Sequence, residues 1–483
     1  MFEILSTYAT AIISLLWTVA ATLTTFHIVL YKREVRSAIG WIGLSWLAPI
    51  IGPVFYMLFG INRIERRAES LRKDLKEYEA PPSVEPLHPS QVETEIHDEQ
   101  YHLGALAHLV GRVVNRPLVP GNHVEPLFNG DEAYPEMIQA IEGAKESVTL
   151  ATYIFDNDSW GDRFVDALAG ASDRGVEVRV LVDAAGLRYS FPSVFNKLKK
   201  RGVPVAKFLP SLFPPHLMSV NLRNHRKTLV VDGDVGFTGG INIREGHVIA
   251  DEPDHPVRDL HFKLTGPVVA HLQEIFVDDW NFSTDEDLRG DAFFPDIETT
   301  GEVIARGIPD GPDEDLEKLP WTLHGALACA RDHVQIVTPY FLPDEPLISA
   351  LNTAALRGVD VDIILPEKSN LPFVHWATFG QLRPVLERGC RVWLTPPPFD
   401  HSKLMVVDGT WTLLGSANWD PRSLRLNFEF NVECYDRDFS GRMAEWISEK
   451  QSRSHRLTLT EYDNRGFATK LRDNVFRLAA PYL

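Results

Sequence analysis

The first sixty residues are dominated by apolar side chains. Leu5–Tyr31 contains no Asp, Glu, Lys or Arg, and after the basic stretch Lys32–Arg36 the chain is again uncharged over Ser37–Asn62. Each run exceeds the roughly 20 residues that a helix needs to cross the hydrocarbon core of a bilayer. The pattern predicts a membrane anchor with two transmembrane helices over residues 1–62. Pro49 and Pro53 leave open whether the second segment crosses fully or is kinked.

The basic residues around these segments predict their orientation. The short loop holds three of them, and the flank after the second segment holds six: Arg63, Arg66, Arg67, Arg72, Lys73 and Lys76. By the positive-inside rule, the large C-terminal part then lies in the cytoplasm. The stretch 77–100 is rich in Pro and Glu and lacks apolar periodicity. We therefore expect a linker over residues 63–100.

From residue 101 onward, β-branched strand patterns alternate with Ala- and Leu-rich helix patterns, and the alternation occurs twice. Ser147–Asp158 precedes Ala167–Asp183 in the first half, and His333–Asp344 precedes Ala350–Pro366 in the second. Each helix pattern ends at an Arg-Gly pair, where glycine suits the end of a helix. Such alternation predicts parallel β–α–β units and an α/β fold. We expect two duplicated halves, 101–290 and 291–483, related by pseudo-two-fold symmetry.

Composition narrows the function classes. The chain has 483 residues, enough for two or three domains, and 44% of them are hydrophobic, which supports folded cores. Its net charge of −18 argues against general binding of nucleic acid, which needs a net basic surface, but leaves room for a local phosphate site. The three cysteines, Cys329, Cys390 and Cys434, are scattered. Neither a disulfide framework nor a zinc site is expected from them.

One ten-residue pattern occurs in both halves: 224–233 reads NHRKTLVVDG and 400–409 reads DHSKLMVVDG. Read as a strand, each copy places its histidine and lysine on one face and ends in an Asp-Gly turn. A Gly-Gly-x-Asn or Gly-Ser-x-Asn sequence follows each aspartate at the same spacing. The shared residues are His225, Lys227, Asp232, Gly240 and Asn242 in the first copy and His401, Lys403, Asp408, Ser416 and Asn418 in the second.

These residue types suit chemistry at a phosphate diester. Lysine is a point charge that binds phosphate oxygens, and small residues let the backbone approach a ligand closely. No carboxylate cluster accompanies the histidines, so a metal site is disfavoured. If the two copies meet across a two-fold interface, one imidazole can attack phosphorus and the other can protonate the leaving alkoxide. The sequence therefore predicts one composite site built from both halves.

The double pattern is similar to the paired His-Lys-Asp motifs of the phospholipase D superfamily, and within it the chain most resembles the bacterial cardiolipin synthases. The similarity covers essentially the whole chain. It is carried by GPVFYMLFG, ATYIFDND, TPYFLPDE, RNHRKTLVVDGDVGFTGGINI, RDLHFKLTGPVV and GSANWDPRSLRLNFEFNV. Asp400 departs from the family pattern, which has an apolar residue before the second histidine. We expect this carboxylate to alter the basicity of His401.

The resemblance implies two phospholipase D-like α-β-α halves and a ping-pong phosphatidyl transfer that needs no cofactor. One histidine attacks a phosphatidylglycerol and expels glycerol, and the hydroxyl of a second phosphatidylglycerol then takes up the phosphatidyl group, giving cardiolipin. It implies that His225 is the nucleophile and that His401 is the general acid and then base. The near-symmetry of the two copies leaves the reverse assignment open. It also implies a multi-pass protein of the bacterial inner membrane, with membrane lipid and not nucleic acid as its partner.

The resemblance assigns the remaining site residues. Those expected to bind the phosphoryl oxygens are Lys227, Lys403, Asn242, Asn418, Gly240 and Ser416. Two carboxylates downstream of the motifs, Asp259 and Glu429, are expected to orient the histidines. Asp232 and Asp408 complete the catalytic motifs, and we expect them to shape the turns rather than to transfer protons.

Other functions stay open on the sequence alone. A phospholipase D that hydrolyses would use water as acceptor, and a membrane-tethered phosphodiesterase or nuclease of the same superfamily would use the same motifs. A non-catalytic lipid-binding protein is a third class. The second lipid substrate and the oligomeric state are also open. Lys207–Lys227 mixes Phe, Leu and Met with basic residues, and is either a lip that contacts the bilayer or an ordinary hydrophobic loop.

Overall fold

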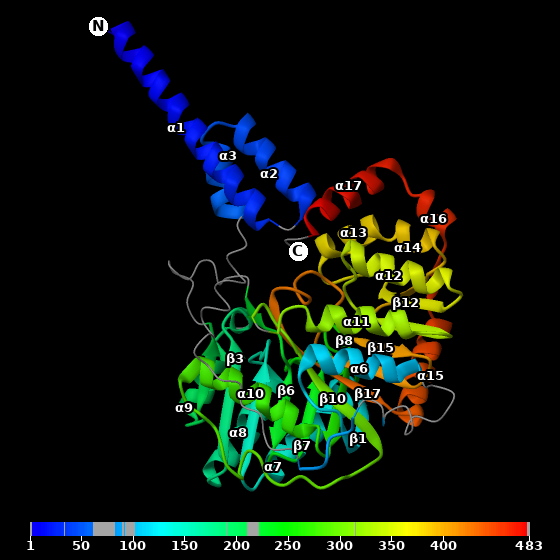
Figure 1. Ribbon diagram of the computed structural model, residues 1–483. Coiled ribbons are helices and arrows are strands. Elements are labelled where there is room, and N and C mark those ends of the chain that lie inside the picture. The colour runs from blue at the N-terminus through cyan, green and yellow to red at the C-terminus, as the bar shows by residue number, and fades with distance from the viewer. Residues whose placement is uncertain are drawn as a thin grey trace. The chain divides into compact units, whose positions relative to one another are not determined.

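The computed structural model describes residues 2–32, 34–60, 83–88, 91, 102–189, 191–209, 222–313 and 315–480. They fall into two units, Met1–Arg67 and Ala68–Leu483, which are considered separately (Figure 1). Most of the predicted linker, and the six basic residues that set the predicted orientation, lie outside the described residues. So does the central part of the candidate lip, 210–221.

The N-terminal unit consists of α1 (Phe2–Tyr31), α2 (Val35–Leu47), α3 (Ile51–Phe55) and a π-helical turn, η1 (Tyr56–Gly60). Within α1, Ala11–Tyr31 is long and apolar enough to cross a membrane. The second uncharged run is not one helix, because α2 ends just before Pro49 and Ile50 adopts a φ of 66°. Proline has no N–H with which to continue the helical hydrogen bonds. Among the described residues, therefore, one of the two predicted transmembrane helices is found, and the second run forms shorter helices.

These shorter helices pack against α1 through polar and aromatic contacts. The indole of Trp46 lies 6.1 Å from that of Trp17, and its Nε1–H donates to the hydroxyl of Thr25 over 3.0 Å. Further along, Nδ1 of His27 lies 2.8 Å from the hydroxyl of Tyr56. The N-terminal unit is therefore a small helical assembly rather than a single extended segment.

One mixed sheet runs through the second unit (Figure 1). Its first-half strands are β1 (Val119–Phe128), β2 (Ser147–Thr152), β3 (Glu177–Asp183), β4 (Val205–Phe208), β6 (Thr228–Val231), β7 (Val235–Gly239) and β9 (Leu260–Thr265). Its second-half strands are β10 (Val303–Asp310), β11 (His333–Val337), β12 (Asp360–Pro366), β13 (Arg391–Thr395), β15 (Leu404–Val407), β16 (Trp411–Gly415) and β17 (Asn427–Tyr435), with β18 (His455–Leu457) at the edge.

The strand order of one half repeats in the other. It runs β4-β3-β2-β6-β7-β9-β1 and then β10-β17-β16-β15-β11-β12-β13. The halves join at the antiparallel pair β1–β10, where Val119 faces Ala305. This mirrored order agrees with an internal duplication and a pseudo-two-fold relation. The predicted parallel pairs are present as β2–β3 and β11–β12, but the motif strands β6 and β15 run antiparallel to their neighbours.

Helices accompany the strands of each half. In the first half they are α6 (His102–Val114), α7 (Asn129–Gly143), α8 (Ser159–Asp173), α9 (Val194–Lys200) and α10 (Val269–Thr284). In the second they are α11 (Lys318–Cys329), α12 (Glu345–Leu356), α13 (Pro372–Gln381), α14 (Arg383–Glu387), α15 (Arg437–Ser452), α16 (Leu459–Asp463) and α17 (Phe467–Leu478). The crossover helices α8 and α12 begin alike, because the side chains of Asp158 and Asp344 accept hydrogen bonds from backbone N–H groups of the first turn. Both are followed by a glycine with positive φ, Gly175 and Gly358, as the sequence predicts.

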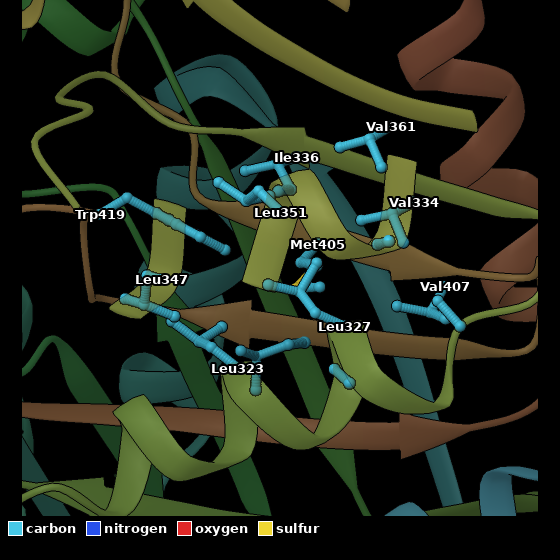
Figure 2. Packing of buried hydrophobic residues seen from close by; sticks show 14 of the residues in the cluster. Leu323, Leu327, Val334, Ile336, Leu347, Leu351, Val361, Met405, Val407 and Trp419 are labelled. Atoms are coloured by element: carbon cyan, nitrogen blue, oxygen red, sulfur yellow. The ribbon is translucent and has the colours of Figure 1, made fainter. Parts of the chain in front are cut away.

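The hydrophobic core lies on both faces of the sheet. Figure 2 shows one face of the second half, where Leu323 of α11 and Leu351 of α12 pack against Ile336 and Met405. The opposite face is covered by α10 and α15, with Leu272 and Met443 in one cluster. Val230 of β6 and Val406 of β15 belong to this cluster, whereas the residues on either side of each belong to the clusters on the other face. Burial on both faces fixes the register of the motif strands, and so the place where the motifs begin.

Candidate active site

The two histidine motifs occupy equivalent places in the two halves. His225–Lys227 connects the two-residue strand β5 (Arg223–Asn224) to β6, and His401–Lys403 connects β14 (Phe399–Asp400) to β15. The histidine and lysine therefore precede each strand instead of lying within it, which corrects the expectation of one continuous strand. The apolar alternation holds only for the residues that follow.

Each motif enters the site along a strand of the other half. β5 pairs in parallel with β17, and the N–H of His225 donates to the carbonyl of Phe428 over 2.9 Å. In the same way β14 pairs with β8 (Val257–Arg258), and the N–H of His401 donates to the carbonyl of Arg258 over 2.7 Å. The two halves are thus interwoven at the histidines.

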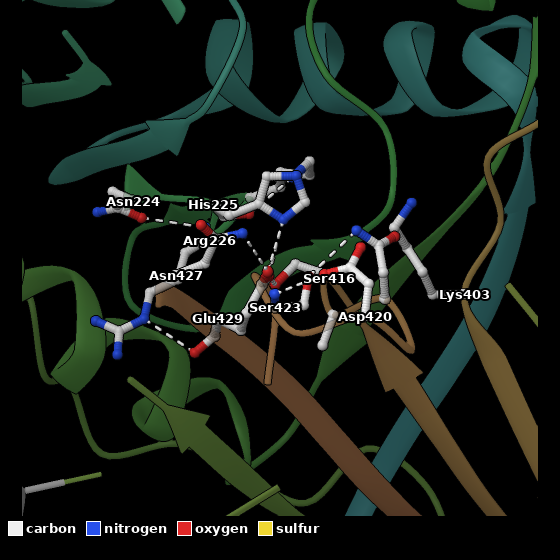
Figure 3. A network of polar contacts seen from close by, with 12 residues as sticks. Asn224, His225, Arg226, Lys403, Ser416, Asp420, Ser423, Asn427 and Glu429 are labelled. Carbon is white, nitrogen blue, oxygen red and sulfur yellow. Dashed lines mark hydrogen bonds and ion pairs between the residues drawn. The ribbon is translucent and has the colours of Figure 1, made fainter. Parts of the chain in front are cut away.

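The carboxylates that contact the histidines are exchanged between halves. Nδ1 of His225 lies 2.9 Å from both carboxylate oxygens of Glu429 on β17 (Figure 3). Nδ1 of His401 lies 2.7 Å from Asp259, directly before β9. Both carboxylates are buried. A neutral imidazole that donates from Nδ1 keeps its lone pair on Nε2. The site therefore contains two imidazoles with Nε2 available for chemistry.

The lysines of the motifs are buried beside these rings. Nζ of Lys227, which is only 2% exposed, donates to the carbonyl of His225 over 2.7 Å, and Lys403 makes the same contact with His401. Burial lowers the pKa of Lys227 to about 7 and that of Lys403 to about 8, because a buried ammonium loses its hydration. Their positive charge is therefore held at a free-energy cost, which an anionic ligand would offset.

Burial also sets the protonation state of the histidines. It lowers the pKa of His225 to about 4, and Lys227 adds to this while Glu429 opposes it. The pKa of His401 is lowered well below its ordinary value by burial and then by the two lysines. Both imidazoles are therefore neutral near pH 7.

The two carboxylates differ in their affinity for protons. Burial raises the pKa of Asp259 to about 6. Burial acts in the same direction on Glu429, but His225, Lys227 and the hydroxyl of Ser416 outweigh it, and the net pKa of Glu429 is lowered. The carboxylate beside His225 thus stays ionised more readily than the one beside His401.

The residues that follow each turn fall into two groups: the asparagines contact neighbouring residues, and the small residues lie against the carboxylates. The side-chain oxygen of Asn242 accepts from the N–H of Ile154 over 3.1 Å, and the amide of Asn418 donates to Ser423 over 3.2 Å. Ser416 and Gly240, which were expected at the phosphate, lie against the carboxylates that contact the histidines. The hydroxyl of Ser416 donates to Glu429 over 2.5 Å, and a Cβ on Gly240 would lie 2.1 Å from Oδ1 of Asp259. Both small residues make room for the carboxylates.

The aspartates of the motifs lie at the far ends of the motif strands. Asp232 and Asp408 adopt φ of 51° and 50° in the turns after β6 and β15. Each carboxylate accepts hydrogen bonds from three successive backbone N–H groups at the start of the neighbouring strand, those of Lys145, Glu146 and Ser147 and those of Arg331, Asp332 and His333. His102 also contacts Asp408, over 2.8 Å. These contacts agree with the expected role of the two aspartates in the turns.

Asp400, the departure from the family pattern, forms an ion pair with Lys450 of α15. Its other oxygen accepts from the N–H of Ser402 over 3.0 Å, and Asn224 makes the equivalent contact with Arg226 over 3.1 Å in the first half. Asp400 opposes the lowering of the pKa of His401, but more weakly than burial and the lysines act. The expected effect on basicity is therefore present and small.

Sequence reasoning missed several neighbours of the histidines. The ring of Tyr153 lies 5.2 Å from that of His225, and the ring of Tyr340 lies 6.1 Å from that of His401. Arg226 is fully buried and pairs with Asp279 of α10 over 2.7 Å. The signal for Arg226 was available, since an arginine in one copy of the motif stands where the other has a serine. Among the described residues, no group of three or more His, Cys, Asp or Glu side chains could hold a metal.

Comparison with known proteins gives consistent matches along the chain. The family described as "Cardiolipin synthase, PLD-like domain" matches residues 137–280 and 323–450, and that described as "Phospholipase_D-nuclease N-terminal" matches residues 19–60. The chain is 31% identical to the cardiolipin synthase of Geobacillus thermodenitrificans, over 98% of this chain and 94% of that protein. It is also 31% identical to the major cardiolipin synthase of Bacillus subtilis, over 94% and 96% of the two chains.

A solved structure supports the fold. The phosphatidylserine synthase of Haemophilus influenzae superposes with a TM-score of 0.61 and 17% identity, covering 78% of this chain and all of that one. At this identity the likeness concerns the arrangement of the strands and helices.

Proposed function

The chain belongs to the cardiolipin synthases with phospholipase D-like domains, and we propose that it transfers a phosphatidyl group between two phosphatidylglycerol molecules, releasing glycerol. One observation carries the proposal. Two neutral imidazoles, His225 and His401, are each held at Nδ1 by a carboxylate of the opposite half, with a lysine beside each. Paired groups of this kind suit two successive displacements at one phosphorus atom.

In the first displacement, Nε2 of His225 attacks phosphorus and the bond from phosphorus to the glycerol oxygen breaks. The negative charge of the bound phosphodiester raises the pKa of His401, so that this imidazole enters the step protonated. His401 gives its proton to the departing oxygen, and glycerol leaves. The phosphatidyl group remains on His225 as a phosphohistidine.

In the second displacement, a hydroxyl of another phosphatidylglycerol attacks the same phosphorus. His401, now neutral, takes the proton of that hydroxyl, and the bond between phosphorus and Nε2 breaks. Cardiolipin is released, His225 is restored, and the proton is again on His401. The two steps balance without a cofactor or an external acid.

The carboxylates support His225 as the nucleophile. A phosphohistidine carries positive charge on its ring, and an ionised carboxylate at Nδ1 stabilises it. Glu429, beside His225, has a lowered pKa, whereas that of Asp259, beside His401, is raised to about 6. We infer that Glu429 and Asp259 orient the two rings and that Ser416 and Gly240 hold these carboxylates in place.

Four side chains provide the charge and donors for the phosphoryl oxygens: Lys227, Lys403, Asn242 and Asn418. All four are buried within the site. Burial lowers the pKa values of the two lysines, and the negative charge of a phosphodiester would offset this cost. The pseudo-symmetric placement lets the two pairs share the oxygens of one phosphate.

We further propose a bacterial inner-membrane protein with anchor 1–62, linker 63–100 and catalytic halves 101–290 and 291–483. α1 supplies one span, and the uncharged segment after it supplies a second, kinked at Pro49. The six basic residues after this segment favour a cytoplasmic catalytic part. Labelling of a Lys76→Cys variant with a membrane-impermeant reagent in intact cells tests the orientation. Labelling of this cysteine without cell lysis would place the catalytic part on the other side of the membrane.

Incubating the purified full chain with phosphatidylglycerol tests the reaction. The expected products are cardiolipin and glycerol in equal amounts. Phosphatidic acid formed without cardiolipin would instead support the hydrolytic alternative. The acceptor range follows from repeating the assay with phosphatidylethanolamine added.

Trapping the intermediate tests the roles of the histidines. With phosphatidylglycerol labelled in its phosphate, His401→Ala is expected to retain label on the protein, because general base catalysis of the second step is lost. His225→Ala is expected to retain none. Label retained by His225→Ala and absent from His401→Ala would reverse the assignment.

A further inference from the structure

The C-terminal helix α17 exposes an apolar face to solvent. Phe467 is 81% exposed, Leu471 and Val475 are each 54% exposed, and Leu478 is 76% exposed. At about 100° per residue these four side chains fall within an arc of about 80° around the helix. Together these four side chains form the α17 face. Soluble surfaces carry scattered apolar residues, but an aligned stripe of this kind marks a contact surface.

The opposite side of α17 is packed, so the orientation of the helix is fixed. Phe476 stacks on Phe373 of α13 with ring centroids 5.1 Å apart and contacts Trp376 at 4.9 Å. Asp473 is fully buried and pairs with Arg465 over 2.6 Å. Figure 1 shows α17 on the outer side of α13. The α17 face therefore cannot turn inward.

The α17 face is bordered by basic residues. Lys470 and Arg477 lie on one side of the apolar arc and Arg472 on the other, by their positions around the helix. The one acidic residue of the helix, Asp473, is buried and paired with Arg472 and Arg465. The helix thus presents net positive charge in a chain whose net charge is −18.

A cavity of about 990 Å³ lies beside the C-terminal end of α17 and is lined mostly by α11, α12, α14 and the loops next to them. Arg477 and Leu478 line one side of it, and Pro421 and Leu424 line another. The α17 face therefore reaches this cavity at Leu478.

We propose that the α17 face lies in the interfacial region of a bilayer that contains anionic lipid, with the helix parallel to the membrane plane. Apolar residues on one side and Lys or Arg along the borders are the features of such helices, since the basic side chains reach phosphate headgroups. The net positive charge of the helix matches the anionic headgroups of such a bilayer, and the aligned apolar face matches its acyl region. The exposure and charge of α17 do not depend on the proposed function.

Spin labels on the full chain test the contact directly. Leu471→Cys and Val475→Cys are labelled in nanodiscs of phosphatidylglycerol and phosphatidylcholine, in a Cys329→Ser background. Leu356→Cys, at the 68% exposed C-terminal end of α12, is the control. We expect the ratio of collisions with oxygen, which enters lipid, to collisions with a water-soluble nickel chelate to be several-fold higher on α17 than at Leu356. Equal ratios would overturn the proposal.

A third result of the labelling is also decisive. Protection of both α17 labels from oxygen and from the nickel chelate would show that protein covers the face, either another segment of this chain or a second copy. That result would overturn the proposal as well.

Activity measurements distinguish this proposal from the proposed function. The double variant Leu471→Glu/Val475→Glu is expected to lose about tenfold or more of its activity on phosphatidylglycerol in vesicles and little in detergent micelles. Leu356→Glu is the matched control and is expected to behave like the unmodified chain in both. Equal losses in vesicles and micelles would contradict membrane contact. Absence of cardiolipin synthesis by the unmodified chain would refute the proposed function and leave the labelling result standing.

Discussion

Replacing Lys227 with methionine is expected to abolish activity and to stabilise the protein. Lys227 is 2% exposed, and its pKa falls from the ordinary 10.5 to about 7 because of burial. At about 1.4 kcal/mol for each pH unit, this difference corresponds to about 5 kcal/mol by which the folded site disfavours the ammonium. Methionine has a similar length and no charge, so it removes this cost.

Part of the gain is offset. The hydrogen bond from Nζ to the carbonyl of His225, 2.7 Å long, is lost, and a buried acceptor without a partner costs about 1–3 kcal/mol. We therefore expect the free energy of unfolding to rise by about 2–4 kcal/mol near pH 7. Cardiolipin formation is expected to fall by at least about 10²-fold, as when an electrostatic donor to a transition state is removed.

The sign of the pH dependence gives a sharper test. The unfolded chain binds a proton at Lys227 up to pH 10.5, whereas the folded chain releases it near pH 7. Between these values the unfolded state holds more protons, so the unmodified protein gains stability from this group as the pH rises. The advantage of Lys227→Met is full below pH 7 and shrinks toward pH 10.

Thermal unfolding of the purified full chain at pH 6, 7 and 9 measures this. Lys200→Met, at an exposed lysine at the end of α9, is the control and is expected to change nothing. A lower melting temperature for Lys227→Met at pH 6 would refute the reasoning. So would a difference from the unmodified chain that does not vary with pH.

Three further outcomes are expected. Glu429→Gln removes a charged hydrogen-bond partner of a buried imidazole, worth about 1.5–3 kcal/mol, and should lower kcat by about 10- to 10²-fold. Ser416→Ala should lower kcat only a few-fold. Equal losses of kcat in the two variants would contradict the role of the carboxylate. The kcat/KM for phosphatidylglycerol should fall as the pH rises past about 7 to 8, because Lys227 and Lys403 lose their protons there, and a profile that stays flat to pH 10 would exclude charged lysines in the free enzyme. Asp408→Ala should lower the melting temperature by several degrees, because three backbone N–H groups lose their acceptor, whereas Asp408→Asn, which keeps one oxygen, should lose less.

The local elements could be predicted from the sequence because they depend on local patterns. The crossover helices α8 and α12 are marked by a capping aspartate at one end and Arg-Gly at the other, and both signals are local. The duplication is visible because both halves keep the same spacing between motif residues. The helices of the second hydrophobic run were harder to predict. The composition of this run fits a membrane span, but Pro49 interrupts the helix, and composition does not show where a helix is interrupted.

The partners within the site could not be predicted. Asp259 and Glu429 were found by their position after each motif, but which histidine each contacts depends on the pairing of β5 with β17 and of β8 with β14. These pairs join segments far apart in the sequence, and nothing in either segment specifies the other. The same limit applies to Ser416. The sequence does not distinguish a small residue that makes room for a bound phosphate from one that makes room for a buried carboxylate.

The exchange of carboxylates explains why the chain needs both copies of its motif. Each histidine takes its Nδ1 partner from the opposite half, so neither half alone holds an oriented imidazole. The surroundings of the two copies nevertheless differ in charge. In the first half Arg226 pairs with an acid of α10, and in the second half Asp400 pairs with Lys450 of the equivalent helix α15. The two halves are therefore similar where they position the histidine rings and differ in charge one residue away. The two histidines thus have different environments, as the proposed roles of nucleophile and proton donor require.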